Sequence, residues 1–90
     1  LEQNYPNPFN PTTNIEFRIG NFGFGVSDFV FVSLKVFDVL GKEVAILVNE
    51  YLHPGTYRKT WNAADFPSGV YFCRLQCGAA GETRRLLVVR

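Results

Sequence analysis

Few side chains in this sequence could do chemistry. There is one histidine, His53, with two cysteines, Cys73 and Cys77, and a few serines. Nucleophilic catalysis needs a base beside a serine, cysteine or threonine, and no motif ties His53 to such a group. His53 is followed by Pro54 and Gly55, a pair typical of a type II turn, so we expect a solvated histidine at a turn. The sequence therefore predicts no catalytic residue and no enzyme.

Metal and cofactor sites find equally little support. The spacing of Cys73 and Cys77 is not that of a C-x-x-C pair, and there is no second cluster. On a strand their Cα atoms would lie about 13 Å apart, too far for a disulfide, so we expect free thiols, with Cys73 buried. The acidic residues are scattered singly, which leaves only weak grounds for a calcium ion held by loop oxygens. We predict no metal and no cofactor.

Length and composition describe one small domain. The 90 residues include 9 basic and 8 acidic side chains, a balance that argues against a nucleic-acid partner. No apolar run approaches the roughly 18 residues that span a bilayer. Nine Phe, four Tyr and one Trp, with no Met, indicate a core built on rings. The chain begins without an initiator Met or a signal peptide, so we expect an upstream cargo domain that is missing from it.

Strand patterns occupy most of the chain and must position any functional side chain. After Gly69, Tyr71, Cys73 and Leu75 alternate with residues of the opposite face, as in a strand with one face toward a core. Tyr71 and Phe72 put an aromatic ring on each face, which suits a central strand with a neighbour on each side. Similar alternation predicts strands at residues 14–19, 29–39, 43–49, 57–61 and 82–89. This spacing predicts an all-β fold, an immunoglobulin-like antiparallel β-sandwich of about seven strands. Gly41 is expected at positive φ in a turn, and Lys59 to reach water past its ring neighbours.

Residues 1–13 form a leader rich in Pro and Asn, which we expect to pack on a sandwich made by residues 14–90. Its prolines favour an extended chain, and a stiff linker is the alternative. Tyr5 and Phe9 argue against a linker, so we expect both rings to dock and the Asn side chains to cap the leader backbone.

The C-terminal stretch is a candidate binding surface. Four successive apolar residues cannot all face one core if their strand lies at an edge, and such an edge offers backbone groups to another chain. A strand buried in a sheet and covered by an upstream domain is the alternative. The same edge could join two copies in a dimer. The candidate recognition residues are Arg84, Arg85, Leu86, Leu87, Val88, Val89 and Arg90.

Four sequence motifs follow one another along nearly the whole chain. They are residues 3–13, which include Tyr5-Pro6-Asn7-Pro8-Phe9, residues 36–44 around Gly41, residues 54–57 around Gly55 with Trp61, and residues 68–76 with Gly69 and Tyr71. Together with the basic, apolar tail they resemble the C-terminal sorting domain, type A, of type IX secretion cargo. A looser similarity is to the immunoglobulin-like domain of flagellar hook-capping proteins. In two respects the sequence departs from the family: residues 20–31 are longer and richer in Phe and Gly than usual, and Arg85 stands where Lys is common.

The resemblance implies a non-catalytic targeting domain that directs an attached cargo protein across the outer membrane, to be secreted or displayed at the cell surface. It implies two partners, the type IX translocon and a sortase-like peptidase, and we expect residues 84–90 to be recognised. Two other functions stay open. One is an accessory module that binds carbohydrate or protein through exposed rings, and the other is a spacer that stabilises a neighbouring domain.

Overall fold

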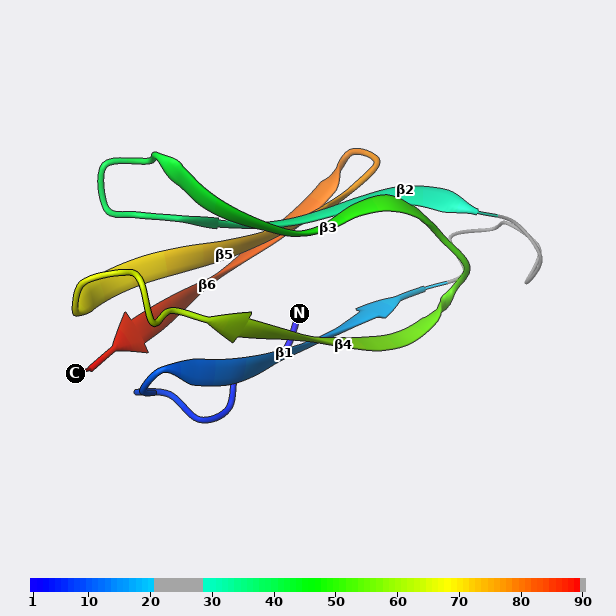
Figure 1. Cartoon of the computed structure of the whole chain (residues 1–90). Coiled ribbons are helices and arrows are strands. Elements are labelled where there is room, and N and C mark those ends of the chain that lie inside the picture. Colours follow the sequence, from blue (N-terminus) through cyan, green and yellow to red (C-terminus); the bar gives the residue numbers. More distant parts are fainter. Residues whose placement is uncertain (21–28, 90) are drawn as a thin grey trace.

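Alternating side chains produce six strands in a computed structural model, which describes residues 1–20 and 29–89 (Figure 1). The strands are β1 (Thr12–Ile19), β2 (Val30–Phe37), β3 (Glu43–Leu52), β4 (Gly55–Asn62), β5 (Gly69–Cys77) and β6 (Ala80–Val88). The described residues contain no helix, and so none that could cross a membrane. The all-β prediction is confirmed, with six strands instead of about seven. Most of the unusual segment 20–31 lies outside the described residues.

The strands form two antiparallel sheets that face each other, as Figure 1 shows. β1 pairs with β4 in a two-stranded sheet, whereas β3, β2, β5 and β6 follow one another in a four-stranded sheet. The sandwich prediction is therefore confirmed. β5 is a central strand, as predicted, and β3 and β6 are the edges of the four-stranded sheet.

The core lies between the sheets, where the alternating apolar side chains meet. Tyr71, Cys73 and Leu75 of β5 are all buried, as the period of two predicted. The ring of Trp61 on β4 packs at centroid distances of 5.4 Å from Tyr71 and 5.7 Å from Phe9. These edge-to-face ring contacts join both sheets and the leader, which confirms a core built on aromatic packing.

The turn between β2 and β3 is built as the sequence predicted. Gly41 has a φ of 84°, a conformation that residues with a Cβ rarely adopt. The Oδ1 atom of Asp38 accepts hydrogen bonds from the backbone N–H groups of Leu40 and Lys42, each at 2.9 Å. An Asp side chain that satisfies turn donors in this way fixes the register at the start of β3.

The prediction of a type II turn at Gly55 is wrong. The φ of Gly55 is 156°, far from the roughly +80° that the third position of a type II turn requires. Gly55 instead begins β4, opposite Ile19 of β1. The corner is held by the Tyr57 hydroxyl, which donates a hydrogen bond of 2.6 Å to the carbonyl of His53. Strand pairing with β1 thus prevails over the local preference of the Pro-Gly pair.

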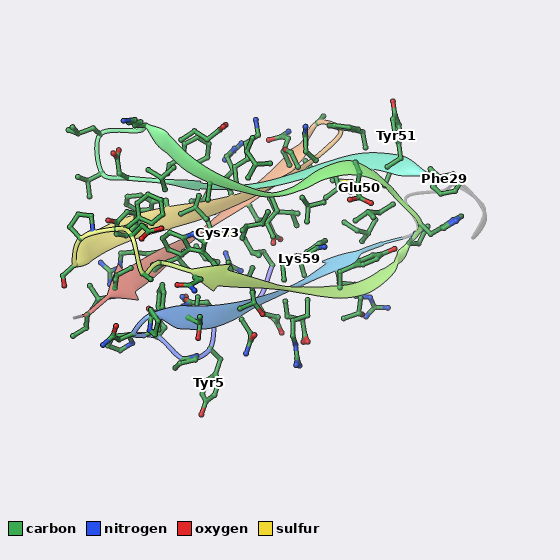
Figure 2. The ribbon with its side chains drawn as sticks, viewed as in Figure 1. Tyr5, Phe29, Glu50, Tyr51, Lys59 and Cys73 are labelled. Atoms are coloured by element: carbon green, nitrogen blue, oxygen red, sulfur yellow. The ribbon has the colours of Figure 1, made fainter. Side chains whose placement is uncertain are left out.

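The side of the sandwich between β3 and β4 carries two inward-pointing charges. Glu50 and Lys59 lie on the strand faces that also bear the buried Val48 and Trp61, and both project into the space between the sheets (Figure 2). Both residues are nevertheless exposed, so Lys59 reaches water, as expected. Inward charges and the register shifts of β3 against β2 are features that discourage pairing of an edge strand with another chain.

Only one of the two leader rings docks. Phe9 is buried, with 3% of its surface exposed, but Tyr5 is 79% exposed and points away from both sheets (Figure 2). The prediction for Tyr5 is therefore wrong. Its backbone pairs with Asn14, through N–H···O bonds of 3.0 and 2.9 Å, and this pairing turns the ring outward.

A small buried polar network holds the leader in shape. The Asn4 amide donates to the Thr13 hydroxyl at 2.9 Å and to the carbonyl of Pro6 at 3.0 Å. The Thr13 hydroxyl donates to the same carbonyl at 2.7 Å. Both side chains are buried, so their polar atoms depend on one another for hydrogen bonds.

Replacing Asn4 with Ala should lower the free energy of unfolding by about 1–3 kcal/mol, because the carbonyl of Pro6 and the hydroxyl of Thr13 each lose a donor. Urea denaturation followed by circular dichroism measures the change. Asn10→Ala, at an exposed position of the same leader, is the control and should change it little. Equal effects of the two substitutions would contradict this account of the network.

Candidate recognition surface

The structure places the two cysteines on β5 and the histidine just after β3. Cys73 and Cys77 are free thiols on the core side of β5. His53 follows β3, and its ring lies 3.8 Å from that of Phe29, centroid to centroid. Within residues 1–20 and 29–89, no group of three or more His, Cys, Asp or Glu could hold a metal ion.

Burial raises the pKa of both thiols. Desolvation raises the pKa of Cys73 from its ordinary 9.0 to about 12, and it also raises the pKa of Cys77. The neutral thiol of Cys73 thus stabilises the fold fully below pH 9, and this contribution is lost as the pH rises towards 12.

Iodoacetamide at pH 8 should label Cys73 at least about 100-fold more slowly in the folded protein than in urea, because labelling requires local opening of β5. Cys77, near the end of that strand and 8% exposed, should react faster than Cys73, which is 1% exposed. Mass spectrometry of timed samples measures both rates. Rapid labelling of Cys73 in the folded protein would show that β5 is not the protected centre described here.

The two faces of β6 differ completely. Leu86 and Val88 are 0% and 1% exposed and belong to the core. Leu87 and Val89 point away from the core and are 38% and 45% exposed. Arg85 is exposed on the same outer face as Leu87. The four successive apolar residues are thus shared between the core and solvent.

The other two arginines of the C-terminal stretch are not part of that outer row. Arg84 is half-buried and lies opposite Cys73, on the inner side of the sheet. Arg90 lies outside the described residues. The structure therefore does not bring the predicted recognition residues together on one face.

The leader covers the backbone edge of β6. Phe9 pairs with β6 in parallel: its N–H donates to the carbonyl of Leu87 at 3.1 Å, and its carbonyl accepts from the N–H of Val89 at 3.0 Å. The Oδ1 atom of Asn7 accepts from the N–H of Leu87 at 2.9 Å. These are the outward-facing backbone groups at this end of the strand.

Further back along β6, the Gln3 amide donates to the carbonyl of Arg85 at 2.8 Å. The prediction that this edge offers free backbone groups is therefore wrong for the groups of Arg85, Leu87 and Val89 that the leader binds. A partner cannot add a strand there while the leader is in place.

The leader also pairs with β1, the edge of the other sheet. The N–H of Glu2 donates to the carbonyl of Glu16 at 3.0 Å, and Tyr5 pairs with Asn14. One segment thus joins β1 to β6 and closes this side of the sandwich. We call residues 1–11, which make these contacts, the clasp.

A patch of exposed rings lies on the outer face of β2 and β3. Phe31 and Tyr51 are 43% and 65% exposed, with ring centroids 5.1 Å apart and planes inclined by 72°. Phe29, which is 58% exposed, lies at the same end of the sheet, and Figure 2 shows Tyr51 pointing away from the sandwich. Because the two paired rings are nearly perpendicular, they form no flat platform.

Comparison with known protein families shows which family the chain belongs to. Residues 3–89 match the family described as the secretion system C-terminal sorting domain. The chain belongs to this family. No curated protein and no solved structure matches it.

A sorting domain of this kind is a non-catalytic targeting signal of the type IX secretion system. It marks proteins that are exported across the outer membrane to the cell surface or into the medium. The recognition of the family from its motifs is therefore confirmed.

Sequence reasoning missed two features of the sorting domain. It did not find the pairing of the leader with β6, although Asn7 and Phe9 both lie in the leader motif that carries the family resemblance. It also gave no role to Lys35 and Arg74, which lie directly opposite each other on β2 and β5. Alternation places both of them on the outer face, but only the register shows that they are neighbours.

Proposed function

We propose that the sorting domain is recognised as a folded unit by the type IX translocon, through outward-facing side chains of β6. Arg85, Leu87 and Val89 form the recognition row. The observation that carries the proposal is the clasp on β6: it occupies the backbone edge, so a partner meets side chains rather than free strand groups. The domain itself does no chemistry, since its thiols are buried and its histidine packs on a ring.

The second partner is a sortase-like peptidase that acts after export on the junction between this domain and the cargo domain joined to it. The clasp supports this order of events. A folded, closed domain presents a stable shape to the translocon, whereas peptidases need an extended substrate that enters their cleft. Cleavage would therefore fall outside residues 1–20 and 29–89, which are folded or tied to the sandwich.

The remaining residues of the C-terminal stretch have a supporting role in this proposal. Leu86 and Val88 anchor β6 in the core, and Arg84 lies half-buried beside it. A dimer formed by edge strands would have to use β3, β4 or the part of β6 before Arg85, because the clasp binds β6 from Arg85 onward and β1 at Asn14 and Glu16. The inward charges Glu50 and Lys59 oppose such pairing, so recognition by the translocon requires only one copy.

Charge reversal and a polar substitution on the recognition row should test the proposal. A reporter fused to the domain with Arg85→Glu and Leu87→Asp should be exported at least about tenfold less than the wild-type fusion, because both side chains face the partner. The control pair is Arg18→Glu with Ile46→Asp, which alters exposed residues on β1 and β3. Equal export of both double variants would refute recognition through β6.

A second candidate function rests on the ring patch. Phe31 and Tyr51 could bind a sugar face or an apolar protein segment, as in an accessory module of a secreted enzyme. This second function requires that isothermal titration with soluble polysaccharides show binding that disappears in the Phe31→Ala and Tyr51→Ala variants. The perpendicular rings favour the targeting function, for which we expect no glycan affinity.

A further inference from the structure

The outer face of the four-stranded sheet bears a shallow hollow between its two central strands. Its volume is about 190 Å³, and the lining side chains come from β2 and β5. The register places Lys35 opposite Arg74 and Ser33 opposite Gln76. Two cations, a hydroxyl and an amide therefore converge here, with Phe37 as the fifth lining residue.

Two like charges lie on directly opposite residues in this outer-face hollow. Like charges directly opposite each other on neighbouring strands are destabilising. Glu43 offsets part of the repulsion, since its Oε1 lies 3.2 Å from the Nζ of Lys35. Within the described residues Arg74 forms hydrogen bonds but no ion pair. One positive charge is thus left over in the hollow, in a position where a bound anion would relieve the repulsion.

The guanidinium of Arg74 is held in place rather than free in solvent. It donates to the Thr83 hydroxyl and to the Oε1 of Gln76, each at 3.1 Å. The Gln76 amide is fixed in turn by a 2.8 Å bond to the carbonyl of Gly78. A guanidinium has more donors than these two bonds use, so it can still bind a carboxylate with a planar fork. Because the side chain is already ordered, little conformational entropy is lost on binding.

Gly81 makes room for this arrangement. A Cβ atom at position 81 would lie 2.7 Å from the Nη2 of Arg74 and 2.9 Å from the Oε1 of Gln76. Real Cβ atoms do not approach other atoms so closely, so a side chain here would displace the guanidinium. The network and the glycine beneath it therefore form one unit that positions Arg74.

We propose that the outer-face hollow binds a carboxylate side chain presented by an acidic protein surface of the secretion machinery. This inference rests on the proposed function and extends it from β6 to the centre of the sheet. A protein is favoured over an anionic membrane because the hollow holds only two cations, one of them paired with Glu43. Surfaces that bind acidic lipid use clusters of about 4–8 basic residues.

Export of a reporter fusion tests the proposal. Arg74→Gln should reduce export about tenfold, the ratio that corresponds to losing charge-assisted hydrogen bonds to one carboxylate. Gly81→Ala keeps every charge but displaces the guanidinium, and it should also reduce export. Arg58→Gln, at a 68% exposed side chain on β4 that pairs only loosely with Glu16 at 3.9 Å, is the matched control and should be exported like the wild type. Thermal melting of each purified domain should show that all three variants stay folded.

The outcomes separate this inference from the function on which it rests. If Arg85→Glu with Leu87→Asp reduces export but Arg74→Gln and Gly81→Ala do not, recognition through β6 stands and the hollow is not a site. If none of these variants reduces export, the proposed function fails and the inference fails with it. Sedimentation with phosphatidylglycerol vesicles is the further arm. Binding of the wild type that is lost in Arg74→Gln would assign the hollow to lipid phosphate and overturn the proposal.

Discussion

Replacing Phe9 with Ala should lower the free energy of unfolding by about 3–5 kcal/mol, the range found when a buried Phe is truncated. The ring is 3% exposed and packs edge-to-face on Trp61 at 5.7 Å. Such a loss is a large part of the roughly 5–15 kcal/mol that stabilises a small domain. The melting temperature should fall on the order of 20 °C, as measured by circular dichroism.

Tyr5→Ala is the matched control for Phe9→Ala, since it truncates the other ring of the same leader motif. Tyr5 is 79% exposed, so this change should shift the free energy of unfolding by less than about 0.5 kcal/mol. If the two variants melted at the same temperature, the leader would not be a clasp, and the closure of the sandwich between β1 and β6 would be refuted.

The second large effect concerns two adjacent leucines on β6. Leu86→Asp should abolish folding, because it places a carboxylate at a side chain that is 0% exposed, at a cost of more than about 4 kcal/mol. Leu87→Asp should leave the domain folded, because that side chain is 38% exposed and faces outward. A proton–nitrogen correlation spectrum of each variant distinguishes a dispersed, folded pattern from a collapsed one.

This contrast changes how export defects in the C-terminal stretch should be interpreted. A block substitution of Leu86 to Val89 would remove core and surface together, so lost export could reflect unfolding alone. Leu87→Asp isolates the surface. Well-dispersed spectra for both Leu86→Asp and Leu87→Asp would contradict the assignment of alternate faces on β6.

Several strands could be predicted from the sequence because their apolar residues alternate with a period of two, whereas β3 was predicted from a continuous apolar run. Ile15 and Phe17 on β1, and Val32 and Leu34 on β2, are buried where alternation places them. The central position of β5 followed from aromatics on both of its faces, Tyr71 and Phe72, and the register confirms it. Local pattern was sufficient here because burial of one face of a strand dictates its side-chain period.

The clasp could not be predicted in the same way. Asn7 and Leu87 are separated by 80 positions, yet they share a hydrogen bond that leaves no local signal in either segment. The exposure of the Tyr5 ring could not be predicted either, because it follows from the pairing of the Tyr5 backbone with Asn14, which points the ring toward solvent. Contacts that depend on how an irregular segment lies across two sheets follow from the tertiary fold rather than from composition.

The candidate site could likewise be predicted only in part. The sequence indicated that the C-terminal stretch is a recognition surface, and we predicted that all of residues 84–90 belong to it. The structure separates the core anchors Leu86 and Val88 from the outward Leu87 and Val89. The like-charged pair of Lys35 and Arg74 becomes visible only in the register of β2 with β5. These neighbours are set by strand pairing, which a single sequence does not specify.

The central claim is that this folded domain is sufficient as a type IX export signal. Its most direct test fuses residues 1–90 to the C-terminus of an inert fluorescent reporter in a bacterium that has the secretion system, with a translocon-deficient strain as the control. The account predicts the reporter at the cell surface or in the medium of the competent strain, and inside the outer membrane of the deficient one. Retention of the folded wild-type fusion inside the outer membrane of both strains would contradict it.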